Sequence, residues 1–182
     1  LGNVPAEFGS KVSGVAVLNS RSGLGTGRAV SGSLAATLGG FGTWQGAGQA
    51  GGELGSRVGY FASLTGTRSN RFLDQVSLDN LHNTGHFTRF FGRVDIRLAN
   101  GAALRLHAMG GRSAFELANL RSQDESGQDQ RQALADLSTW ATYQRVLGSQ
   151  ATLESTVGFR TTTAALTPSA GDTPVTASQD RR

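Results

Sequence analysis

The chain contains no cysteine and, among its 182 residues, only three prolines and one lysine. Without cysteine it can form neither a disulfide framework nor a thiolate zinc site. No stretch approaches the roughly eighteen consecutive apolar residues of a membrane-spanning helix. Glycine is abundant, at 26 residues, but it lacks the three-residue period and the proline content of collagen. The length fits one domain or part of a larger one.

Charge is present but scattered. The formal net charge is +4, and 16 of the 17 basic residues are arginine, with Lys11 as the exception. An arm that binds nucleic acid usually clusters its charge. Here the arginines are spread through segments of alternating character, which disfavours such an arm and leaves an anionic surface or an arginine-rich lumen as explanations of the charge. We therefore expect no nucleic-acid partner, and a basic nucleic-acid-binding β protein is the least favoured class.

Apolar and polar residues alternate in several segments, most clearly in "FTRFFGRVDIRL", residues 87–98. Because successive side chains of a strand point to opposite faces, this segment predicts one apolar and one charged face. The same alternation recurs at 30–38, 58–65, 104–109 and 152–160. The pair Asn100-Gly101 between two such segments is a strong hairpin signal. The pattern predicts antiparallel strands joined by hairpins.

Two segments are weaker. Residues 42–53 consist mostly of glycine and glutamine around Trp44, but they stand between two clear strands. Residues 131–147 fit both a helical stripe and a strand alternation, and we interpret them as a strand because both neighbours are strands. Together the segments predict about seven consecutive antiparallel strands.

The connections are sorted by length. Those near Gly55, Gly101 and Gly148 are tight, whereas 72–85, 117–130 and 167–180 are long and polar. Membrane barrels combine short periplasmic turns with long extracellular loops. The apolar faces are also rich in glycine and alanine, which makes a thin core for a soluble sandwich. We expect an all-β fold, an antiparallel up-and-down meander forming part of a transmembrane β-barrel wall, unclosed because about seven strands are too few.

At its N-terminal end the chain resembles a known family. The stretch "PAEFGSKVSGVAVLNSRSG", residues 5–23, is similar to the end of the plug domain of TonB-dependent outer-membrane receptors, in which an A-E-[FY]-G turn precedes a G-V-[IV]-x-[VL] strand and a T-K-S-G-like turn. The phrase "SNRFLD", residues 69–74, is similar to one that recurs in the carboxypeptidase-regulatory-like subgroup. The matching positions are Ala6, Glu7, Phe8, Gly9, Gly14, Val15, Val17, Ser22 and Gly23; Arg21 replaces the lysine and Asn19-Ser20 the threonine.

The resemblance implies a domain division and a function. Residues 1–26 would be the C-terminal end of the plug with its linker, and 27–182 the first strands of a barrel in the outer membrane of a Gram-negative-type bacterium. Such receptors take up scarce solutes such as iron chelates, cobalamin, glycans or peptides. The implied partners are outer-membrane lipid, the remaining plug and barrel, the imported solute, and the inner-membrane energy-transducing TonB complex, which would act through an N-terminal region absent here. The family is not enzymatic and no cofactor is implied.

The polar stretch between the strands at 58–69 and 87–98 contains His82 and His86, four residues apart. On a helix this spacing can bind a metal. The intervening Asn-Thr-Gly residues are typical of a loop, so we expect no metal site. Long loops of such barrels contact ligands, and the candidate solute contacts are Arg71, Asp74, Asn80, His82, Asn83 and His86.

Charged residues gather on the predicted interior face: Arg89, Arg93, Asp95, Arg97 and Arg105. We favour an ion-pair network that holds the plug, and the open alternative is electrostatic steering of an anionic solute. No Ser-His-Asp arrangement, carboxylate pair or nucleophilic cysteine points to catalysis. A soluble or surface-exposed β-sandwich, or an adhesin-like binding module, is the alternative function.

Overall fold

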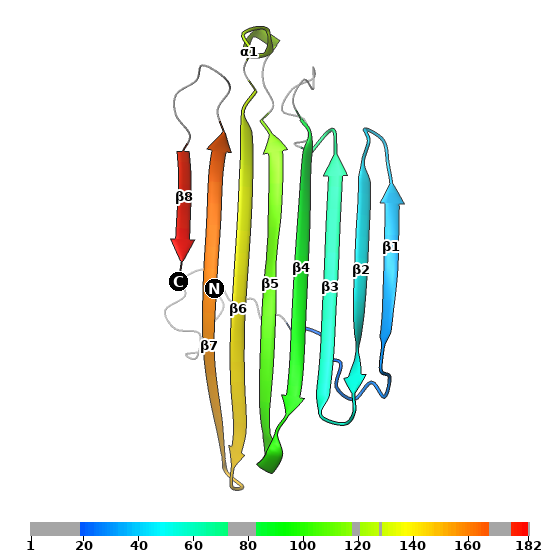
Figure 1. The fold of residues 1–182 in the computed structure, drawn as a ribbon, viewed down its shortest axis with the longest axis vertical. Helices are drawn as coiled ribbons and strands as arrows, with labels where there is room; N and C mark the ends of the chain where they lie inside the picture. The colour runs from blue at the N-terminus through cyan, green and yellow to red at the C-terminus, as the bar shows by residue number, and fades with distance from the viewer. Residues whose placement is uncertain (1–18, 73–82, 118–120, 128, 168–175, 182) are drawn as a thin grey trace, which may run out of the picture.

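The protein is described by a computed structural model covering residues 19–72, 83–117, 121–127, 129–167 and 176–181. This part of the chain forms one sheet of eight antiparallel strands that follow one another in chain order (Figure 1). The all-β, up-and-down, unclosed architecture predicted from the alternation is confirmed. The strands are β1 (Ser31–Leu38), β2 (Trp44–Leu54), β3 (Val58–Ser69), β4 (Gly85–Arg97), β5 (Ala102–Glu116), β6 (Arg131–Leu147), β7 (Ala151–Thr167) and β8 (Thr176–Arg181).

The two ambiguous segments are strands, as predicted: the glycine-rich one is β2 and the segment at 131–147 is β6. The predicted number of strands was too low. Residues 176–181 form β8, which pairs with Thr161–Leu166 of β7, inside a region predicted to be a loop. The long connection at 117–130 also contains a short helix, α1 (Arg121–Glu125).

The strand lengths and turn geometry fit the predicted arrangement of tight connections at one end of the sheet and long connections at the other. Strands β6 and β7 each have 17 residues, about three times the length of an average soluble strand. The lower β4–β5 turn contains the 3-10 segment η2 (Ala99–Gly101), where Asn100 and Gly101 have φ values of 57° and 70°. Positive φ at both positions matches the right-handed twist of the flanking strands. Long connections lie at the opposite, upper end (Figure 1).

The strand register gathers the apolar residues on one side of the sheet. Leu34 pairs with Gly48, Gly48 with Leu64, and Leu64 with Phe90. Directly paired residues share a face, so these side chains form one surface, which we call the apolar face. The opposite side, which carries Arg89, Arg93 and Arg97 of β4 and Arg105 of β5, is the polar face.

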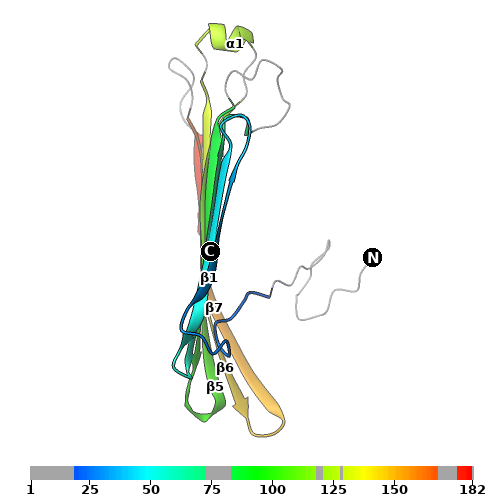
Figure 2. The same cartoon turned by 90° about the vertical axis from the view of Figure 1, so that its right-hand side faces the viewer.

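The sheet is a single layer when viewed from its edge (Figure 2). Among the described residues the only buried hydrophobic residue is Ala102, and Leu34 on the apolar face is 92% exposed. In the same part of the chain no helix is long and apolar enough to cross a membrane. Within the described residues the sheet therefore has no hydrophobic core, and the side chains of the apolar face are exposed.

The segment that precedes β1 runs along the lower half of the sheet (Figure 2). Its end is fixed to the sheet by two hydrogen bonds: the Glu53 amide donates to the Arg28 carbonyl at 2.8 Å, and Tyr60 Oη donates to the Ala29 carbonyl at 2.9 Å. Its beginning, from residue 19 to 24, lies against the polar face, as the contacts below show.

Candidate functional site

The centre of the polar face is an arginine–aspartate pair on β4. Arg93 and Asp95 are two residues apart, so both side chains leave the same face of the strand. Arg93 Nε donates to Asp95 Oδ2 and Arg93 Nη2 donates to Oδ1, each at 2.8 Å. The exposed fractions of the two side chains are 16% and 6%. Two parallel bonds fix the guanidinium and the carboxylate in one plane.

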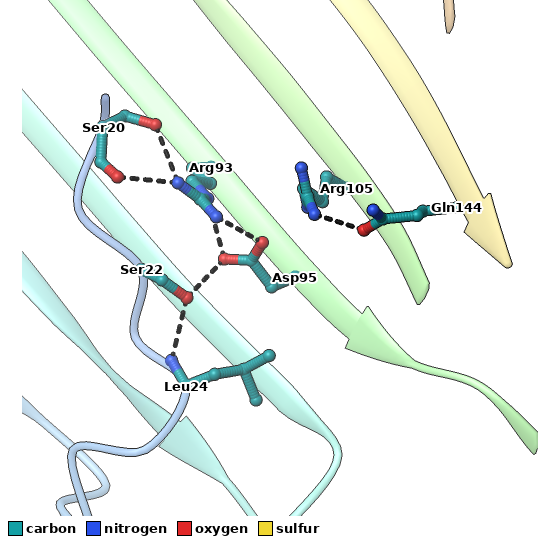
Figure 3. Close-up of polar contacts among 7 residues, drawn as sticks. All are labelled: Ser20, Ser22, Leu24, Arg93, Asp95, Arg105 and Gln144. Carbon is teal, nitrogen blue, oxygen red and sulfur yellow. Dashed lines mark hydrogen bonds and ion pairs between the residues drawn. The ribbon is translucent and has the colours of Figure 1, made fainter. Parts of the chain in front are cut away.

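The pair holds the N-terminal segment against the sheet (Figure 3). Ser22 Oγ donates to Asp95 Oδ2 at 2.6 Å, and Arg93 Nη1 donates to the Ser20 carbonyl at 2.7 Å and to Ser20 Oγ at 3.0 Å. The Leu24 amide in turn donates to Ser22 Oγ at 3.1 Å. We call Ser20, Ser22, Arg93 and Asp95 the clamp. The residues that these bonds join between the segment and β4 are 73 positions apart in the sequence.

Glycine allows the segment to lie this close to the strands. A Cβ at Gly23 would overlap the carbonyl oxygens of Gly52 and Tyr60, and a Cβ at Gly59 would overlap the Leu24 amide. The atoms that obstruct a Cβ at Gly23 are strand backbone, which cannot move without breaking the sheet ladder, whereas those that obstruct one at Gly59 belong to the segment itself. Two residues without side chains therefore let the clamp close.

We expect Gly23→Ala to detach the segment, because the added methyl group meets backbone rather than a flexible side chain. Overpacking of this kind costs about 1–3 kcal/mol. Trypsin should then cleave the folded protein faster at Arg21 and Arg28, which flank the glycine. Gly40→Ala is the matched control, since a Cβ at Gly40 meets nothing within 4 Å. Equal cleavage rates for the two variants would contradict the packing role of Gly23.

Beside the clamp, four ring side chains form a row across the polar face, from β3 to β6. The centroids of Phe61 and Phe91 are 6.2 Å apart, those of Phe91 and His107 are also 6.2 Å apart, and His107 stacks on Trp140 at 4.8 Å with an interplanar angle of 9°. A hollow of about 540 Å³ lies between this row and residues 19–21 at the beginning of the described N-terminal segment. Glu154 and Arg105 also line the hollow.

The structure brings some of the predicted interior charges together and separates others. Arg105 shares the polar face with Arg93 and Asp95, as the alternation predicts. The register places it opposite Asp95, and it donates to Gln144 Oε1 at 2.5 Å. Arg97 is exposed at the lower end and donates to the Ser56 carbonyl at 3.0 Å. Arg89 lies four residues above Arg93, about 13 Å away along the strand. The ion pair itself comprises Arg93 and Asp95.

Three of the predicted loop contacts, Asp74, Asn80 and His82, lie outside the described residues. Of the others, the Arg71 guanidinium lies 5.0 Å from the centre of the Phe41 ring. Asn83 is buried, and its carbonyl accepts a bond from the Phe72 amide at 2.7 Å. His86 was placed in the loop by its polar neighbours, but it lies within β4, paired with Arg68.

Several residues of the site were missed by sequence reasoning. Ser22 matched the plug motif and Ser20 departed from it, and neither gave any indication of what it contacts. The ring row was also missed, although Phe91 and His107 lie on the predicted polar faces of their strands and so gave a signal. Within the described parts of the chain, no group of three or more histidine and acidic residues is arranged to hold a metal ion. The site can hold residues 19–24 against the polar face of the sheet, and it exposes aromatic rings and charged groups to the neighbouring hollow.

Comparison of the chain with protein-family models, with curated proteins and with solved structures finds no match. The functional argument therefore rests on the geometry described above.

Proposed function

We propose that the chain is part of a TonB-dependent outer-membrane receptor that imports a scarce solute. In this proposal the segment before β1 is the end of the plug, and the eight strands are the first part of the barrel wall. The observation that carries the proposal is the clamp: a segment with plug-like sequence is fastened to the polar face of an unclosed sheet, and the other face is apolar. A barrel with a plug in its lumen requires this sidedness.

The single layer favours this function over a soluble sandwich. In a sandwich, the inner faces of two sheets pack about 10 Å apart and bury their side chains. The described residues form one sheet, whose large apolar side chains are exposed, for example Leu64 at 56% and Val157 at 72%. Facing lipid, these side chains need no second sheet. In this proposal the upper end faces the outside of the cell, which the long upper connections and tight lower turns support.

The clamp supplies a mechanical role in such a receptor. Energy-coupled import pulls on the plug from the periplasmic side, and part of the plug must move for a solute to pass. Ser20 and Ser22 of the clamp precede β1 in the chain. A force transmitted along the plug toward β1 would therefore be resisted by their hydrogen bonds to Arg93 and Asp95. The end of the plug stays attached while preceding residues rearrange. The hollow beside the ring row then lies next to the part that moves.

The gene that encodes the chain provides the first test. We expect additional plug sequence upstream of Leu1 and further segments of alternating character downstream of Arg182. The full gene product should fractionate with the outer membrane and should migrate differently on gels before and after heating, as folded barrels do. Recovery of the product in the soluble fraction without detergent would refute the proposal and favour a sandwich.

A further inference from the structure

Two arginines and a histidine from three neighbouring strands lie at the upper end of the apolar face. Arg68 lies near the end of β3, His86 near the start of β4, and Arg112 in the upper part of β5. The register pairs Arg68 directly with His86 and places Arg112 opposite Thr88, one position further along the same face. All three are exposed. We call Arg68, His86 and Arg112 the basic rim.

Among the described residues, no acidic group neutralises the basic rim. Within the described residues, none of its three side chains takes part in a hydrogen bond or an ion pair. Arg131, on the same face, differs: its Nη2 lies 3.5 Å from Glu116 and 3.0 Å from Asp129. The carboxylate that the described part of this face carries, Glu116, is therefore engaged by another arginine, and within the same residues the donors of the rim have no protein acceptor.

A hollow of about 750 Å³ adjoins the rim and joins polar to apolar surface. It is lined by His86 and Arg112, by the threonines Thr88 and Thr163, and by Phe90. Asp136 also lines the hollow, but it pairs with Gly111 and so belongs to the polar face. The guanidinium, imidazole and hydroxyl groups can donate hydrogen bonds to an anionic group, and the aromatic ring can contact an apolar chain. The hollow therefore suits a ligand that combines the two.

A second feature places the rim at the boundary of a membrane. Trp44 pairs directly with Arg68 at the same upper end of the apolar face and is 47% exposed. Tryptophan is enriched where hydrocarbon meets headgroups, because its ring is apolar and its N–H is polar. Below this level the apolar face continues through Leu64, Phe90 and Val94 along β3 and β4.

We infer that the basic rim binds the phosphate of a phosphorylated lipid headgroup in the leaflet at the long-loop end. The inference rests on the proposed function, because it needs the apolar face to be in lipid. Guanidinium groups bind phosphate through parallel hydrogen bonds, and basic residues next to a membrane recognise anionic headgroups. The acyl chains of the bound lipid lie on the apolar surface below the rim, beside Phe90.

The test uses the full gene product, folded in detergent and stripped of lipid, with diphosphorylated lipid A as the probe. Binding is followed by native mass spectrometry. We expect the double variant Arg68→Gln/Arg112→Gln to weaken binding by about 25-fold, since each arginine near an anionic group contributes a factor of about five. Arg68→Lys/Arg112→Lys keeps the charge and should retain most of the binding. Arg145→Gln, exposed on the same face at the lower end, is the matched control.

The phosphate is tested with dephosphorylated lipid A, which should bind wild type and the double glutamine variant equally and weakly. Equal binding of lipid A by wild type and this variant would overturn the inference, as would an equal loss in Arg145→Gln. If the gene product forms a heat-modifiable barrel and the rim variants bind normally, the inference alone fails. If the product is soluble without detergent, the proposed function fails with it.

Discussion

Replacing Asp95 with alanine should destabilise the folded protein by about 3 kcal/mol, because the substitution leaves the Arg93 guanidinium without its partner in a largely enclosed place. Removal of one member of a buried pair costs more than the pair contributes, since the remaining charge is desolvated and uncompensated. Ser22 also loses its acceptor, so the N-terminal segment should detach. The free energy of unfolding of the full gene product, measured by urea titration in detergent, gives the loss.

Two further variants identify the source of this loss. Ser22→Ala should cost about 1.5–3 kcal/mol, the usual range for a hydrogen bond to a charged group. Combined with Asp95→Ala, it should add little, because both substitutions break the same contact. Asp136→Asn changes a carboxylate on the same face without removing an ion pair found among the described residues, and it should be near neutral. If Asp136→Asn costs as much as Asp95→Ala, charge on this face matters in general and the clamp has no special role.

Arginine at position 108 should be far more damaging than arginine at position 109. Ala108 lies on the apolar face near the middle of β5, and Met109 lies on the polar face. At the middle of a bilayer, an arginine that faces lipid destabilises a barrel by about 2–4 kcal/mol, whereas residues facing the lumen tolerate charge. Adjacent positions in one strand share backbone environment and strand propensity, so each variant controls for the other.

The measurement is the folded fraction of each variant in lipid vesicles across a denaturant titration. A cost of less than about 1 kcal/mol for both variants would mean that the apolar face is in contact with water. That result would count against a membrane-embedded wall and would favour the soluble alternative. An equal and large cost would mean that both faces are packed against protein.

Alternation predicted most of the sheet because it records which side of each strand is apolar. The pairs from Leu34 to Phe90 follow from that parity, and so does the shared face of Arg93, Asp95 and Arg105. Strand β8 was missed because Pro168, Gly171 and Pro174 precede it and its own six residues are mostly polar. Strand β8 forms because its backbone hydrogen-bonds to β7, and backbone pairing of this kind cannot be inferred from the side chains of β8.

The clamp could be predicted only in part, for a related reason. That Arg93 and Asp95 lie side by side follows from their spacing. That Ser22 meets Asp95 depends on the path of a segment 73 positions away. His86 was assigned to a loop because Asn83, Thr84 and Gly85 precede it. In the structure the ladder of β3 already begins at Ser69 and Gly85, so the strand includes the histidine.

The order of the strands has a consequence for how the chain acquires its structure. Each strand pairs with the one before it in the sequence, so every hairpin can form by a short-range search that costs little loop-closure entropy. The link between Ser22 and Asp95 is different, because its acceptor does not exist in place until β4 has joined the sheet. The hydrogen bonds of the clamp can thus form only after β4 has paired in the sheet, and they can form before β5 to β8 are added.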